Sequence, residues 1–187
     1  IIGITGSIAS GKSTALKVLS RKKYPAFSAD LEVKKLYSSR SFINKICKKF
    51  NIKKDNNLKN EIKSAILKKP RLIKTLEKII HPHVRKKMIK FINKNSSKQF
   101  AFLEIPLLLE SKLSRHFDLV ICITSSKNLR LKRYKKVGGD IKLFKIFDSK
   151  QIKKNKKTNF CDINIVNNKN FIVFKKKLND VLSNINE

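Results

Sequence analysis

One short segment near the start of the chain constrains the fold more than any other part of the sequence. Residues 6–13 read GSIASGKS, which matches the phosphate-binding pattern GxxxxGK[ST] in full. The apolar, β-branched run 1–5 precedes this segment, and residues 13–19 after it place apolar side chains at helical spacing. A strand, a glycine-bracketed loop and a helix in this order predict a parallel α/β fold.

The residue types in this segment predict a site for the phosphates of ATP. Main-chain N–H groups and the helix N-terminus supply partial positive charge, and Gly11 lets the backbone approach a phosphate closely. By the same pattern, Lys12 reaches the β- and γ-phosphates and Ser13 binds Mg²⁺. The predicted members of the loop are Gly6, Ser7, Ile8, Ala9, Ser10, Gly11, Lys12, Ser13 and Thr14.

The rest of the chain alternates between runs of strand length and runs of helical spacing. Apolar runs at 100–105, 119–123 and 163–166 are typical of strands buried on both faces, and a shorter run at 26–29 ends before Asp30. We therefore predict an α/β fold with a doubly wound parallel sheet of five strands in three layers. Helical spacing covers 41–95, 128–136, 141–156 and 170–185, with Pro70 and Pro82 interpreted as first-turn residues.

Composition limits the function less than the motif does. Lys and Arg number 45 against 13 Asp and Glu, a net charge of +32 that suggests nucleic acid or an anionic membrane as a partner. Lysine is scattered through every segment with abundant Ile and Asn, however, which is the pattern of an AT-rich genome. Cys47, Cys122 and Cys161 are odd in number and form no CxxC pair, so we expect reduced thiols without a disulfide or zinc site.

The apolar stretches are too short to cross a bilayer. The start, IIGITG, has neither a basic stretch nor a cleavage site and reads as a strand. We therefore expect a cytoplasmic monomer with no membrane partner, for which nucleic acid is not the expected ligand.

Several segments, in order along the chain, resemble the dephospho-CoA kinase family. The resemblance implies an enzyme of the P-loop NTPase fold that transfers the γ-phosphate of ATP to the ribose 3′-hydroxyl of dephospho-CoA, completing coenzyme A biosynthesis. It also implies a nucleotide-binding core at 1–30, 96–130 and 157–187, a helical acceptor domain at 31–95 and a lid at 131–156. The segments are TGSIASGKST at 5–14, SAD at 28–30, HP at 81–82, LEIPLLLE at 103–110, LRLKR at 129–133 and QIKKNKKTNFCDINIVNN at 151–168.

The resemblance, carried over residue by residue, implies roles for the candidate site residues. The assignments are Lys12, Asp30 and Arg133 as catalytic residues; Asp30, His81 and Glu110 facing dephospho-CoA; Ser13 and Glu104 holding Mg²⁺; and Asn167 near the adenine of ATP.

Structural alternatives stay open for several of these residues. Asp30 can cap a helix, Arg133 can lie on a solvated helix face, and Glu110 can end an apolar stretch in solvent. His81 with Pro82 can simply begin a helix. Glu104 stands where the family usually has Asp, and its extra methylene leaves the metal role open.

The chain also departs from the family pattern. Val137 replaces an arginine expected near the lid turn, after Lys135 and Lys136, so we expect attraction for ATP with reduced turnover. Ser7 and Ala9 replace loop glycines, which is tolerable if both keep φ below zero.

Two other functions fit parts of the sequence. One is another P-loop kinase, such as a nucleoside monophosphate kinase. The other is a nucleotide-regulated nucleic-acid-binding protein, which the charge alone suggests. A GTPase is disfavoured because residues 168–171 read NKNF and lack the acidic residue of a guanine-reading NKxD motif.

Overall fold

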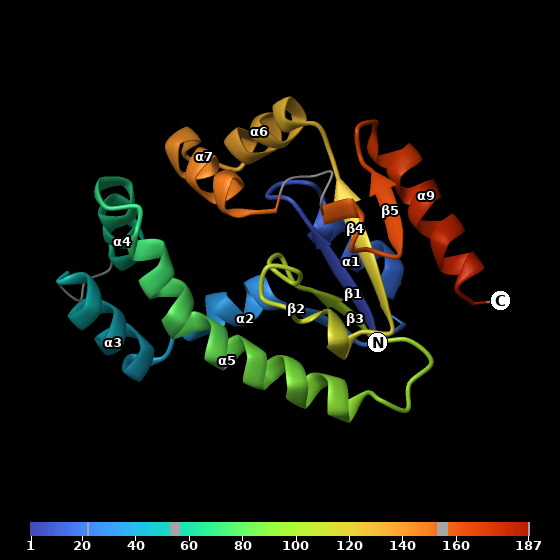
Figure 1. Cartoon of the computed structure of the whole chain (residues 1–187), viewed down its shortest axis with the longest axis horizontal. Coiled ribbons are helices and arrows are strands. Elements are labelled where there is room, and N and C mark those ends of the chain that lie inside the picture. The colour runs from blue at the N-terminus through green and yellow to red at the C-terminus, as the bar shows by residue number, and fades with distance from the viewer. Residues whose placement is uncertain (22, 53–56, 153–156, 187) are drawn as a thin grey trace. The chain divides into compact units, whose positions relative to one another are not determined.

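The chain is described from a computed structural model, which covers residues 1–21, 23–52, 57–152 and 157–186. It divides into two compact units (Figure 1). The sheet unit contains residues 1–28 and 92–187, and the helical unit contains residues 29–91. Each unit is described by itself below.

The sheet unit is built on five parallel strands in the order β2-β3-β1-β4-β5. Strand β1 lies at the centre, and its register places Ile4 beside Glu104 on one side and Ile121 on the other. This arrangement confirms the predicted five-stranded parallel sheet. The strands are β1 (Ile2–Gly6), β2 (Ala26–Ser28), β3 (Phe102–Glu104), β4 (Leu119–Thr124) and β5 (Ile163–Val166).

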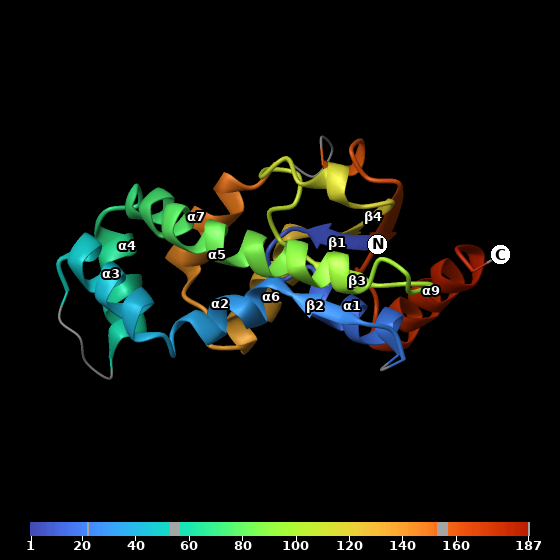
Figure 2. The ribbon, with the colours of Figure 1, turned by 90° about the horizontal axis from the view of Figure 1, so that it is seen from below.

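Four α-helices and a short 3-10 helix (Ser114–His116) have their bounds within the described part of the sheet unit. Helices α1 and α9 lie side by side, as Figures 1 and 2 show. Their buried side chains share one apolar core with the strands. Leu19 and Leu178 are fully buried in this core, and each such side chain contributes about 1.5–3 kcal/mol. The helices are α1 (Lys12–Ser20), α6 (Lys127–Lys136), α7 (Ile141–Lys150) and α9 (Phe171–Asn184).

The helical unit buries apolar stripes at helical spacing. Phe42, Ile46 and Phe50 lie four residues apart along α3, and α4 repeats the pattern with Ile62 and Ile66. Ser39 caps α3, because its side chain accepts a hydrogen bond from the backbone N–H of Phe42. The helices are α2 (Ala29–Leu36), α3 (Arg40–Phe50), α4 (Leu58–Lys68) and α5 (Leu72–Lys94), the last of which ends in the sheet unit.

The interpretation of His81 and Pro82 as a helix start is wrong. Pro82 lies inside α5, which continues on both sides of it. Proline has no N–H and therefore cannot donate to the carbonyl of Lys78, which weakens the helix locally. Ile79 and Met88, on either side of the proline, are buried, so packing holds the helix together across the defect.

Two other helix boundaries differ from the sequence prediction. Helix α2 begins at Ala29, so Asp30 is not its N-cap but lies in its first turn, where a carboxylate favours the positive end of the helix dipole. Helix α7 ends at Lys150, because Gln151 is extended; residues 153–156 of the predicted helix lie outside the described residues. Within the described ranges, none of the helices has the length and apolar character that a bilayer crossing requires.

Candidate active site

The predicted phosphate loop connects the end of β1 to the start of α1. Gly6 and Gly11 have φ values of 147° and 108°, which residues with a side chain rarely adopt. A Cβ atom on Gly6 would lie 2.1 Å from the carbonyl oxygen of Ile123, and one on Gly11 would lie 2.4 Å from Nδ2 of Asn167. Both glycines are therefore required by backbone conformation and by space.

Ser7 and Ala9, which stand where the family has loop glycines, are expected from the sequence to keep φ below zero. This expectation holds at Ser7 but fails at Ala9. Ala9 has φ of 57°, in the left-handed region, whereas Ser7 is not among the described residues with positive φ. This conformation costs a non-glycine residue roughly 1–2 kcal/mol. Neighbouring bonds hold the strained turn, including one in which the Ser10 N–H donates to the Ser7 carbonyl at 3.2 Å.

The start of α1 is arranged to receive an anion. The first N–H groups of a helix have no partner within the helix, and here the N-cap is Gly11, which supplies no capping side chain. The first turn contains no acidic residue. Lys12 is 6% exposed, and its Nζ donates to the carbonyl of Ser7 at 3.0 Å, so its charge is held against the loop. Helix dipole and ammonium group together favour a phosphate.

Glu104 at the end of β3 is the centre of the polar contacts beside this loop. Its side chain is almost fully buried, with Oε1 accepting from the Ser13 hydroxyl at 2.7 Å and Oε2 accepting from the Ser28 hydroxyl at 2.8 Å. Carboxylate, hydroxyl and phosphate oxygens are the ligands that Mg²⁺ takes at nucleotide sites. The oxygens of Ser13 and Glu104 therefore fit a magnesium ion bound with a nucleotide.

Asn167 joins the phosphate loop to Arg133. The side-chain Nδ2 of Asn167 donates to the Ser10 carbonyl at 2.8 Å. The main-chain carbonyl of Asn167 accepts from the Arg133 guanidinium at 3.1 Å. Arg133 also donates to the Ser125 hydroxyl at 3.2 Å. Arg133 is thus anchored, which excludes the alternative of a side chain lying free on a solvated helix face.

Sequence reasoning missed two residues that hold the loop at Ile8. The Ile8 N–H donates to Oε1 of Gln151 at 2.9 Å, and its carbonyl lies 3.4 Å from the Arg130 guanidinium. Arg130 is 7% exposed and pairs with Asp148 at 2.6 Å, which links α6 to α7. Both segments carry recognisable motifs, yet nothing in the local pattern shows that Gln151 and Arg130 meet at one loop residue.

Glu110 lies in a buried ion pair with Lys157, not at a solvated end. The Lys157 ammonium, only 1% exposed, donates to Oε1 of Glu110 at 3.0 Å. The same oxygen accepts from the Ile152 N–H at 3.0 Å. Glu110 therefore anchors the chain that follows α7. Its predicted contact with the acceptor stays a prediction.

Two cysteines of the sheet unit, Cys122 and Cys161, interact with each other. The hydrogen bond between the Cys122 and Cys161 side chains lowers the pKa of Cys122, and the Lys157 and Lys12 ammonium groups lower it further, while burial opposes them. The same bond, with burial, raises the pKa of Cys161. All three cysteines are free thiols.

Asp30 and His81 belong to the helical unit. Asp30 lies in the first turn of α2, directly after the strand whose Ser28 bonds to Glu104, and His81 is exposed on α5. Their roles stay predictions.

A parallel sheet with a GKS loop after its central strand, an uncapped helix and a serine–carboxylate pair define a P-loop nucleotide-binding protein. A family model described as dephospho-CoA kinase matches residues 1–172. The chain is 31% identical to the dephospho-CoA kinase of Rickettsia bellii, over 98% of this chain and 96% of that one. It belongs to the dephospho-CoA kinase family.

Solved structures share the fold over nearly the whole chain. A Thermus thermophilus protein matches with a TM-score of 0.75 and 22% identity, covering 98% of this chain and 96% of that one. The dephospho-CoA kinase from Campylobacter jejuni matches with a TM-score of 0.66 and 23% identity, with the same coverage. At these identities the structural matches show the fold alone.

Proposed function

We propose that this chain transfers the γ-phosphate of ATP to the ribose 3′-hydroxyl of dephospho-CoA, with Mg²⁺ as the metal. The observation that supports it most directly is the Ser13–Glu104 contact beside the uncapped start of α1, in a member of this family. We include a cytoplasmic location and a monomeric state in the proposal.

The phosphate loop supplies binding and positive charge. The N–H groups at the start of α1 and the Lys12 ammonium hold the β- and γ-phosphate oxygens and stabilise the charge that spreads over them during transfer. Mg²⁺, held by Ser13 and Glu104, adds positive charge at these oxygens when it is bound.

Three further residues are assigned to the transfer step. Asp30 accepts the proton of the attacking hydroxyl or orients this group, because a carboxylate is suited to both tasks. Arg133 turns toward the γ-phosphate, exchanging a bond to Ser125 or Asn167 for one to a phosphate oxygen. Asn167 holds the phosphate loop through its bond to the Ser10 carbonyl and lies near the adenine of ATP.

The acceptor and the lid are assigned by segment. Residues 31–95 bind dephospho-CoA, with His81 and Glu110 contacting it. The lid segment 131–156, of which residues 153–156 lie outside the described residues, folds over ATP and excludes water. Glu110 keeps its bond to Lys157 in this arrangement.

A coupled assay with Mg²⁺-ATP tests the function directly. We expect phosphorylation of dephospho-CoA and not of nucleoside monophosphates, with GTP a poor donor. Lys12→Ala and Asp30→Asn should each abolish most of the activity. Turnover of a monophosphate in preference to dephospho-CoA would contradict the proposal.

A further inference from the structure

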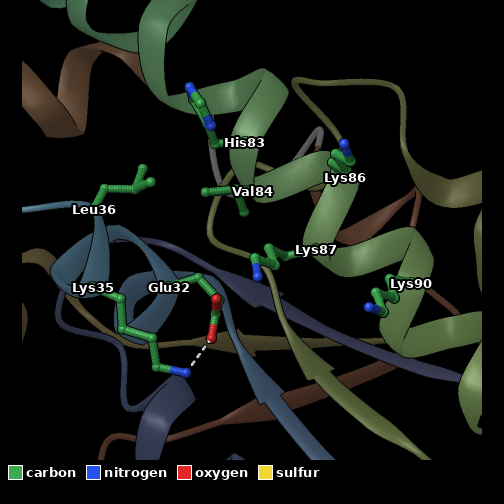
Figure 3. Close-up of a pocket in the computed structure, with 8 residues that line it drawn as sticks. All are labelled: Glu32, Lys35, Leu36, His83, Val84, Lys86, Lys87 and Lys90. Carbon is green, nitrogen blue, oxygen red and sulfur yellow. Dashed lines mark hydrogen bonds and ion pairs between the residues drawn. The ribbon is translucent and has the colours of Figure 1, made fainter. Parts of the chain in front are cut away.

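The helical unit contains a pocket of about 370 Å³ between α2 and α5. Three of the lining residues belong to α2 and five to α5. Figure 3 shows the Lys87 ammonium pointing from α5 toward α2. This volume lies within the range of small-molecule sites. The lining residues are Glu32, Lys35, Leu36, His83, Val84, Lys86, Lys87 and Lys90.

The charge of this pocket is strongly unbalanced. Glu32 is the one carboxylate among the lining residues, and it is already paired with Lys35 at 2.6 Å. In the described part of the chain, Lys86, Lys87 and Lys90 form no ion pair that would balance them. Three ammonium groups therefore remain available to an anionic ligand.

These lysines also repel one another. Lys86 and Lys87 lie four and three residues before Lys90, so their side chains lie on one face of α5. Like charges at this spacing destabilise a helix, and an anion between them relieves the repulsion. Lys86 and Lys90 are separated by about 6 Å of helix rise, which suits a ligand with more than one charged group.

We propose that this pocket binds the diphosphate of dephospho-CoA, an inference that rests on the proposed function. The diphosphate carries adjacent anionic groups for the three lysines, and the apolar side chains of Leu36 and Val84 contact uncharged parts of the same ligand. Lysines act as point charges without a fixed geometry, so this pocket provides affinity for the acceptor and leaves the transfer step unchanged.

The experiment compares two double variants with the same change in charge. Lys86→Gln with Lys90→Gln removes two pocket lysines, and Lys74→Gln with Lys78→Gln removes two exposed lysines at the same spacing on the same helix, outside the pocket. We expect the pocket variant to raise the KM for dephospho-CoA about ten-fold at low salt, with kcat and the KM for ATP within about two-fold of wild type. The control variant should match wild type.

Each outcome decides a different question. If both double variants raise the KM equally, general attraction by the +32 charge explains the effect and the pocket proposal is wrong. An unchanged KM for dephospho-CoA in the pocket variant would also show that the pocket proposal is wrong. If wild-type protein has no activity on dephospho-CoA, the proposed function fails first, and thermal unfolding of all three proteins shows whether they fold alike.

Discussion

The phosphate loop and the lysine-lined pocket both attract phosphate, but they are built in opposite ways. In the loop, side chains from distant parts of the chain fix single atoms, as the buried Glu104 does for Ser13 and the half-buried Gln151 does for Ile8. In the pocket, exposed lysines on one helix supply charge without fixed partners. Changes in the loop should therefore disturb geometry and kcat, whereas changes in the pocket should disturb affinity and its dependence on salt.

The most damaging single change should be Gly6→Ala. The new methyl group would meet the backbone oxygen of Ile123, which cannot move without distorting β4. We expect kcat/KM to fall at least about 10³-fold in the coupled assay. Gly138→Ala is the matched control, because Gly138 also has positive φ, 76°, but nothing lies within 4 Å of the added atom. Comparable losses in both variants would mean that backbone strain, and not the loop contact, is decisive.

The second-largest loss of activity is expected for Glu104→Gln, which should lower kcat about 10²-fold. An amide supplies one acceptor oxygen where Ser13 and Ser28 now use two, and it removes the negative charge that fits a metal. Titration with Mg²⁺ should show a higher requirement in the variant. Glu104→Asp keeps the charge and should retain most of the activity; an unaltered Mg²⁺ requirement in Glu104→Gln would contradict the assignment.

Gln151→Ala should lower kcat/KM for ATP about ten-fold, a smaller loss. It leaves the Ile8 N–H without its acceptor, so the loop samples other conformations, but no group that touches phosphate is removed. Gln151→Glu keeps an acceptor oxygen in place and should restore most of the activity. A failure of rescue with a normal unfolding temperature would argue against a positioning role.

The smallest expected effect is a gain. Val137 lies 80% exposed at the end of α6, after two lysines that attract ATP without fixing it. If geometry limits the lid, Val137→Arg should raise kcat a few-fold with little change in the KM for ATP. Val137→Lys adds charge alone and is the control. An equal gain from lysine would show that charge suffices there.

Local patterns in the sequence predict one part of this molecule well. The loop motif and the apolar runs predict the order of the strands and helices, because each depends on neighbours along the chain. Pro82 within α5 could not be predicted, since its tolerance depends on the burial of Ile79 and Met88. The turn that contains Ala9, with its positive φ, is held in part by a residue far away in sequence, because Asn167 donates a hydrogen bond to the neighbouring Ser10 carbonyl.

The candidate site shows the same division. Ser13 and Glu104 follow from the motif and the resemblance, and their hydroxyl and carboxylate do meet. The Arg130–Asp148 pair joins two helices that the sequence separates by a glycine turn, so no periodicity reveals it. Long-range side-chain pairs of this kind require the fold before they can be recognised.

Both main-chain groups of Ile8 are held by residues of α6 and of the segment after α7. Those two elements cannot rotate away from the loop without releasing its turn. Thermodynamic reciprocity then requires that a nucleotide which stiffens the turn also restrains α6 and the segment after α7, by an equal free energy. Opening of this region and departure of the bound nucleotide are thus two aspects of one equilibrium.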